Sequence, residues 1–80
     1  MYYVYLLRSV SSPAKTYIGC TKDMPLRLQE HNDGLVPHTV DHKPWKLVAL
    51  TGFYDNDKAV KFKTFLKSGP GRVFTQKHWL

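Results

Sequence analysis

The run Tyr2-Tyr3-Val4-Tyr5-Leu6-Leu7 constrains the fold more than any other part of the chain. Every side chain in it is apolar or aromatic, so the strand that it predicts needs cover on both of its faces. Residues 9–15 contain Ser-Ser-Pro and predict a turn, after which residues 16–19 (Thr-Tyr-Ile-Gly) predict a short second strand. We therefore expect a β-hairpin whose first strand lies inside the fold.

The remaining elements follow from helix and strand signals. Asp23 is a good N-cap for a helix that ends near Asn32, where Asn-Asp-Gly supplies a stop. Residues 35–44 predict a polar loop and residues 45–51 a third strand. A second helix is expected over residues 58–67, ended by the Ser-Gly-Pro-Gly of residues 68–71, with one more short helix in the tail, residues 72–80.

This order, β-β-α-β-α with an optional last helix, predicts an α/β fold of the α+β type. The expected sheet is small, three-stranded and mostly antiparallel, with helices flanking it. The chain has 80 residues, which favours a single domain over residues 1–80. Five Tyr, four Phe and two Trp supply the large buried area per residue that so small a core needs.

Charge and cysteine content narrow the class of protein. Twelve Lys and Arg against six Asp and Glu give a net charge of +6, which suggests a polyanionic partner; basic charge that only maintains solubility is an equal alternative. The single cysteine, Cys20, excludes an internal disulfide. Because there is neither an export signal nor an apolar run that could span a bilayer, we expect a soluble cytoplasmic protein with no membrane partner.

Four ordered features carry a family resemblance. Tyr3-Val4-Tyr5 and Tyr17-Ile18-Gly19 form two triplets, Arg27 and His31 follow in the first predicted helix, and residues 65–74 read Phe-Leu-Lys-Ser-Gly-Pro-Gly-Arg-Val-Phe. This set, which extends over nearly the whole chain, resembles the small single-domain members of the GIY-YIG endonuclease superfamily. The resemblance implies the fold of that family and hydrolysis of a phosphodiester bond, usually in DNA.

The resemblance also implies roles for individual residues. Tyr5 and Tyr17 become the paired tyrosines, one of which helps to activate a water; Arg27 steadies the phosphate, and His31 assists the tyrosine. Members of the family use one divalent ion, Mg²⁺ or Mn²⁺, held by a glutamate. The expected partner is nucleic acid, with DNA favoured, and a partner protein is a further possibility because so small a surface offers little specificity.

The residues themselves permit these roles without requiring them. Side chains on adjacent strands approach within about 5 Å, so the Tyr5 and Tyr17 hydroxyls could converge; ordinary core packing of both rings is the competing interpretation. Arg27 and His31 are four residues apart and share one helix face, where a guanidinium could bind a phosphate or simply face solvent. Further basic residues are candidates for nucleic-acid contacts: Lys15, Lys22, Arg72 and Lys77.

One position departs from the family pattern. Lys63 stands where the metal-binding glutamate is expected, and an ammonium has no lone pair with which to ligate a metal ion. Cys20 stands where many members have lysine, and is more readily a buried small residue than a reactive thiol. His38 and His42 lack a matching ligand set, so we interpret them as ordinary loop residues and predict no metal ligand in the chain.

Three functional hypotheses stay open on the sequence. The leading one is a GIY-YIG-type nuclease domain that binds DNA and whose activity is limited by Lys63. The second is a nucleic-acid-binding module without catalysis. The third is a protein-interaction domain that uses exposed aromatic side chains such as Trp79.

Overall fold

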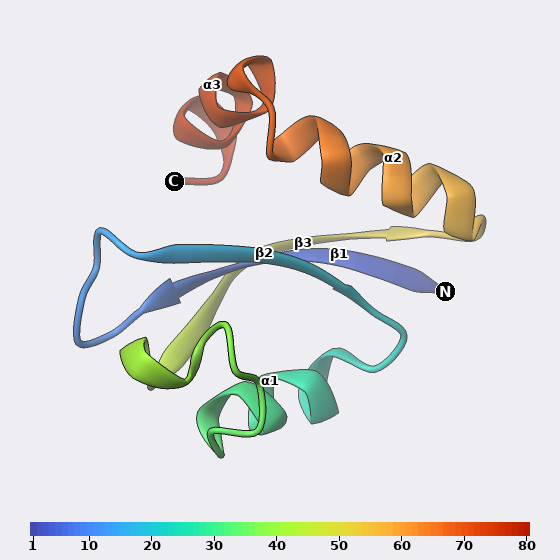
Figure 1. The fold of residues 1–80 in the computed structure, drawn as a ribbon. Helices are drawn as coiled ribbons and strands as arrows, with labels where there is room; N and C mark the ends of the chain where they lie inside the picture. Colours follow the sequence, from blue (N-terminus) through green and yellow to red (C-terminus); the bar gives the residue numbers. More distant parts are fainter.

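A three-stranded antiparallel sheet with helices on both faces makes up the fold (Figure 1). The computed structural model describes residues 1–80 in full. The elements in chain order are β1 (Tyr2–Ser9), β2 (Thr16–Thr21), α1 (Met24–Asn32), a 3₁₀ turn η1 (Val40–His42), β3 (Trp45–Phe53), α2 (Asn56–Leu66) and α3 (Gly69–His78). The predicted α+β class and element order are confirmed, and the optional last helix is present.

β1 is the central strand, and the sheet order is β2-β1-β3. It pairs antiparallel with both neighbours, so that Tyr5 lies opposite Gly19 of β2 and Leu50 of β3. Four successive residues from Val4 to Leu7 are buried, although a strand alternates its side chains between the two faces. Both faces are therefore covered, as the apolar run predicted.

The alternation divides the interior into two layers, which Figure 1 shows on opposite sides of the sheet. One layer packs Tyr5 and Leu7 against α1 and Trp45. The other packs Val4 against Ala59 and Leu66 of α2, with a rim of partly buried aromatic and aliphatic side chains: Tyr2, Ile18, Phe53, Phe62, Phe74 and Trp79. Trp79 is therefore part of the second layer, which corrects the expectation that it is an exposed docking residue.

The helix boundaries differ from the prediction mainly at residues 68–71. α2 ends at Leu66, and the Ser68 side chain caps α3 by accepting a hydrogen bond from the Gly71 amide at 3.3 Å, with Pro70 accommodated in the first turn. A side chain at Gly71 would overlap the Phe65 carbonyl and the Leu66 backbone. The Ser-Gly-Pro-Gly segment thus follows the end of α2, as predicted, but α3 begins within it at Gly69 and not at residue 72, so the junction of the two helices is tight.

The other predicted signals act as expected. The Asp23 carboxylate accepts a hydrogen bond from the Leu26 amide at 3.1 Å, and α1 ends at Asn32. Asp55 caps α2 through the Asp57 amide at 2.8 Å. None of the helices has the length and apolar character that crossing a membrane would need.

Candidate active site

Tyr5 and Tyr17 project from adjacent strands toward the α1 face of the sheet. Tyr17 lies opposite Leu7 in the β1–β2 register, so the two tyrosines are diagonal neighbours. Their ring centroids are 6.3 Å apart, and each ring also contacts His31, with centroid distances of 5.8 and 5.2 Å. The predicted convergence of the two phenols with the histidine is present in the structure.

Gly19 makes room for the Tyr5 ring. A Cβ atom at this position would overlap the Tyr5 hydroxyl and lie 2.6 Å from Cζ, and it would lie 3.0 Å from the Tyr17 ring. The glycine is needed because the Tyr5 side chain approaches the β2 backbone closely here. It lets the Tyr5 phenol extend across β2 to reach α1.

Tyr5 is tied to a buried hydrogen-bond chain. Its hydroxyl lies 2.9 Å from Nε2 of His31, whose Nδ1 lies 2.7 Å from the Thr39 hydroxyl. The Thr39 hydroxyl donates to the Val36 carbonyl at 3.3 Å, so it accepts the proton of Nδ1. This assigns the Nδ1–H tautomer to His31 and makes Tyr5 the donor to Nε2.

Thr39 is a site residue that sequence reasoning missed. It is fully buried within the segment predicted as a polar loop, and its carbonyl accepts a hydrogen bond from the Trp45 indole at 2.8 Å. Asn32 secures the same region, because its side chain bonds both the amide and the carbonyl of Trp45. No periodic pattern marks an isolated threonine in a loop, so only the tertiary fold reveals its position.

Burial shifts the pKa values of the tyrosine and the histidine in this hydrogen-bond chain. It raises the pKa of Tyr5, an effect that the neighbouring Arg27 guanidinium opposes through hydrogen bonding. Burial also lowers the pKa of His31, and the charge of Arg27 lowers it further. Both groups are therefore neutral near pH 7, so the Tyr5–His31 contact is a hydrogen bond between uncharged partners.

Arg27 lies at the edge of this cluster. Its interaction with Tyr5 is the largest of the effects that raise the pKa of the guanidinium. It also donates to the Glu30 carboxylate at 3.3 Å, and a third of its side chain is exposed. The cation therefore lies next to the phenols and keeps a solvent-facing side that can bind an anion.

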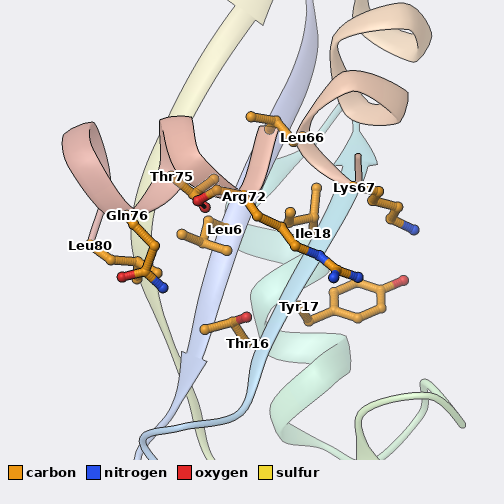
Figure 2. A pocket seen from close by; sticks show the side chains of 10 residues that line it. All are labelled: Leu6, Thr16, Tyr17, Ile18, Leu66, Lys67, Arg72, Thr75, Gln76 and Leu80. Atoms are coloured by element: carbon orange, nitrogen blue, oxygen red, sulfur yellow. Dashed lines mark hydrogen bonds between the residues drawn. The ribbon is translucent and has the colours of Figure 1, made fainter. Parts of the chain in front are cut away.

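Tyr17 differs from Tyr5 in its access to solvent. Tyr5 is completely buried, whereas Tyr17 is half-buried and its hydroxyl makes no hydrogen bond within the chain. Tyr17 lines a cleft of about 460 Å³ between β2 and the α2–α3 junction, together with Lys67 and Arg72. Figure 2 shows the Arg72 side chain extending from α3 toward the Tyr17 ring.

Of the four predicted nucleic-acid contacts, only Arg72 lines this cleft. Lys15 lies in the hairpin turn and Lys77 in the last turn of α3, both exposed. The Lys22 ammonium lies over the Tyr2 ring, 4.9 Å from its centroid, beside a second and more apolar groove. Lys67, which was not predicted as a nucleic-acid contact, is the second cationic residue that lines the cleft.

The residues present do not fit a divalent metal ion. No three His, Cys, Asp or Glu side chains are grouped closely enough to hold one. Burial raises the pKa of the Cys20 thiol, and the charges of Lys63 and Lys67 on α2 oppose that rise. Cationic side chains therefore occupy the part of α2 where the family pattern places a metal-binding glutamate, and burial keeps the thiol protonated.

Comparison with known proteins places the chain in a family. The model of the "GIY-YIG catalytic domain" family matches residues 1–71. The chain is similar to structure-specific endonuclease subunit SLX1 of Podospora anserina, 38% identical over 79% of this chain and 20% of that protein. It is also similar to SLX1 of Candida dubliniensis, 36% identical over 82% of this chain and 26% of that protein. The chain thus spans about a quarter or less of the length of these relatives.

Proposed function

The chain belongs to the GIY-YIG catalytic domain family, and from this premise we propose that it binds DNA beside β2 and hydrolyses a phosphodiester bond there. One observation carries the proposal: two phenols, a neutral histidine and a guanidinium converge at the edge strand and adjoin a basic cleft. Burying a histidine costs free energy unless its ring nitrogens are hydrogen-bonded, and both nitrogens of His31 have a partner.

The two tyrosines have different tasks in this proposal. Tyr17 has a free hydroxyl on the cleft, so it orients the attacking water and is the catalytic phenol. Tyr5 has no exposed surface and donates to His31, so it is a positioning residue that holds Arg27 and the Tyr17 ring in place. Arg27 neutralises the phosphate charge that increases as the water attacks.

The substrate class is part of the proposal. The relatives named above are subunits of structure-specific endonucleases, so we infer a branched DNA substrate and a partner protein for this chain as well. The small size of the domain supports this, because a cleft of about 460 Å³ contacts few nucleotides on its own. The selection of a branch point would then depend on a second protein.

A cleavage assay tests the proposal. Flap, four-way and linear DNA duplexes are incubated with the protein in Mg²⁺ or Mn²⁺, and products are resolved on denaturing gels. We expect slow cleavage of the branched substrates, and a loss of about 100-fold in Tyr17→Phe, the range for a group that assists proton transfer. Absence of cleavage by folded wild-type protein on every substrate would contradict the nuclease activity.

Lys63→Glu sharpens the assay. A divalent ion that stabilised the leaving oxygen would lower the activation free energy by several kcal/mol. Restoring the carboxylate should therefore raise the rate by roughly a thousandfold in Mg²⁺. Lys61→Glu makes the same charge change on an exposed position of α2 and should leave the rate near that of the wild type. Equal rates for the two variants would show that the missing carboxylate does not limit the reaction.

The position of Lys63 favours a second candidate function, DNA binding without cleavage. The Lys63 ammonium group extends from α2, and its charge acts on Cys20 of β2. No grouped carboxylates could hold a metal ion in its place. In that case wild-type protein binds branched DNA and leaves it intact, whereas Lys63→Glu cuts it. The same gels therefore distinguish the two functions.

A further inference from the structure

Three cationic side chains gather at one end of α2, around the cleft beside β2. Lys67 and Arg72 line the cleft, and Lys63 lies one helical turn before Lys67 on the same face of α2. Both lysine charges lower the pKa of Cys20, which agrees with ammonium groups on the side of α2 nearer to β2. Lys67 and Arg72 therefore line one opening from two different helices, and Lys63 lies one helical turn away on α2.

None of these cations is neutralised within the chain. The one ion pair of the structure joins Arg27 to Glu30, on the opposite face of the sheet. The acidic residues of α2, Asp55 and Asp57, lie at the other end of that helix. Lysines in the last turn of a helix also interact favourably with its dipole, but the dipole does not account for Arg72, which belongs to α3.

The cleft has the chemistry of an anion site. Its polar lining comes from Lys67, Arg72, the free Tyr17 hydroxyl and neutral side chains such as Thr16 and Gln76, with no Asp or Glu side chain. A guanidinium can donate two parallel hydrogen bonds to phosphate oxygens, and ammonium groups add point charge. The same cations repel a divalent metal ion, for which no ligand group exists here.

We propose that Lys63, Lys67 and Arg72 form a phosphate-binding site that takes a nucleic-acid phosphodiester directly, without a divalent ion. The inference rests on the proposed function for the identity of the anion, but it requires no cleavage. Lys63 stands where the family pattern places a metal-binding glutamate, so a fixed cation takes that position in this chain. DNA binding by this chain is therefore independent of metal.

Fluorescence anisotropy with a labelled flap DNA tests this site. The full chain is titrated in EDTA and in Mg²⁺ at matched ionic strength, over a series of salt concentrations. We expect affinity in EDTA to equal or exceed that in Mg²⁺. The double variant Lys63→Gln/Lys67→Gln should reduce the slope of log K against log salt by about 1.8, and Arg72→Gln by about 0.9, since each phosphate contact contributes about 0.9.

The matched control is Lys58→Gln/Lys61→Gln, which removes the same charge from the same helix at two exposed positions outside the cleft. It should keep the wild-type slope, and Lys67→Arg should keep most of the affinity. Thermal melts confirm that each variant is folded. Loss of binding in EDTA, or equal losses in the two double variants, would overturn the site.

The outcome is separable from that of the cleavage assay. If wild-type protein binds DNA in EDTA and cuts none in any metal, the proposed hydrolysis fails and the phosphate site stands. If it cuts DNA while Lys63→Gln/Lys67→Gln binds with the wild-type slope, the phosphate site fails and the hydrolysis stands.

Discussion

The two faces of the sheet are stabilised by different interactions. The face under α1 buries a polar chain, Tyr5 to His31 to Thr39, in which every proton has one assigned acceptor. The face under α2 and α3 buries hydrocarbon and aromatic rings in tilted and edge-to-face contact, such as Phe62 with Phe53 and Phe74, and has its cations at the rim.

The difference separates two tasks that a small domain must combine. Buried hydrogen bonds are directional, so the α1 face can hold a phenol and a histidine in one orientation. Aromatic packing is less directional, so the other face can bring α2 and α3 together and present charges to a ligand. β2 joins the two, because its alternating side chains place Tyr17 toward one face and Ile18 and Cys20 toward the other.

The largest expected effect on stability comes from a substitution that disrupts the aromatic face, where α3 packs against α2. Gly71→Ala adds a Cβ that overlaps the Phe65 carbonyl, a backbone atom that cannot turn aside, so α3 must move away from α2. We expect a loss of about 3 kcal/mol or more in the free energy of unfolding, measured by urea denaturation. Gly69→Ala is the control, because no atom lies within 4 Å of its added Cβ. A similar loss in both variants would mean that the helix junction is not close-packed.

A smaller effect is expected where the two faces meet at β2. Gly19→Ala displaces the rigid, buried Tyr5 ring, and we expect a cost of about 2 kcal/mol together with loss of the Tyr5–His31 hydrogen bond. Gly52→Ala is the matched control on β3, because its added Cβ meets mainly the flexible end of the exposed Met1 side chain. An unchanged urea midpoint in Gly19→Ala would show that the ring has room to shift.

The structure was predictable from the sequence where one local pattern decides the outcome. The buried strand β1, the Asp23 cap and the apolar face of α2 follow from periodicity and capping. The start of α3 did not, because Gly-Pro-Gly indicates a stop unless the close approach at Gly71 is known. The position of Lys67 in the cleft was also not predictable without the fold, because no local sequence pattern places a lysine at the end of a helix in a cleft.

The site residues divide in the same way. Tyr5, Tyr17, Arg27 and His31 were found through the order of their motifs, which carries information that composition does not. The burial of Tyr5 follows from its place in the apolar run predicted to lie inside the fold, whereas the exposure of Tyr17 depends on the position of β2 at the edge of the sheet. Thr39 was missed because its partner His31 is eight residues away through an irregular loop.

The Thr39 hydroxyl tests the polar face more finely. Thr39→Val keeps the shape of the side chain but leaves the His31 Nδ1–H without a partner, whereas the Val36 carbonyl keeps the hydrogen bond from the Thr39 amide, so we expect a loss of about 1–3 kcal/mol. Thr39→Ser retains the hydroxyl and should lose less. ¹⁵N chemical shifts of the imidazole report the tautomer directly. A His31 ring that remains wholly in the Nδ1–H form in Thr39→Val would contradict the assigned role.

The smallest effect is a pH dependence confined to the polar face. Burial and the Arg27 charge lower the pKa of His31 in the folded chain, while Glu30 opposes them. The unfolded chain then binds a proton more readily than the folded chain, so stability falls as the pH drops below about 6.5, the ordinary value for histidine. The contribution of His31 is complete above that pH and is lost as the pH falls through the folded pKa.

Urea denaturation at pH 7.5, 6.5 and 5.5 measures this slope for the wild type and for His31→Gln. The slope should shrink in His31→Gln, whereas His38→Gln, which removes an exposed histidine from the same loop region, should retain it. If both variants keep the wild-type slope, the buried imidazole accepts a proton without penalty. In that case the hydrogen-bond chain would not hold His31 neutral, and the orientation of Tyr5 would have to come from packing alone, as on the opposite face of the sheet.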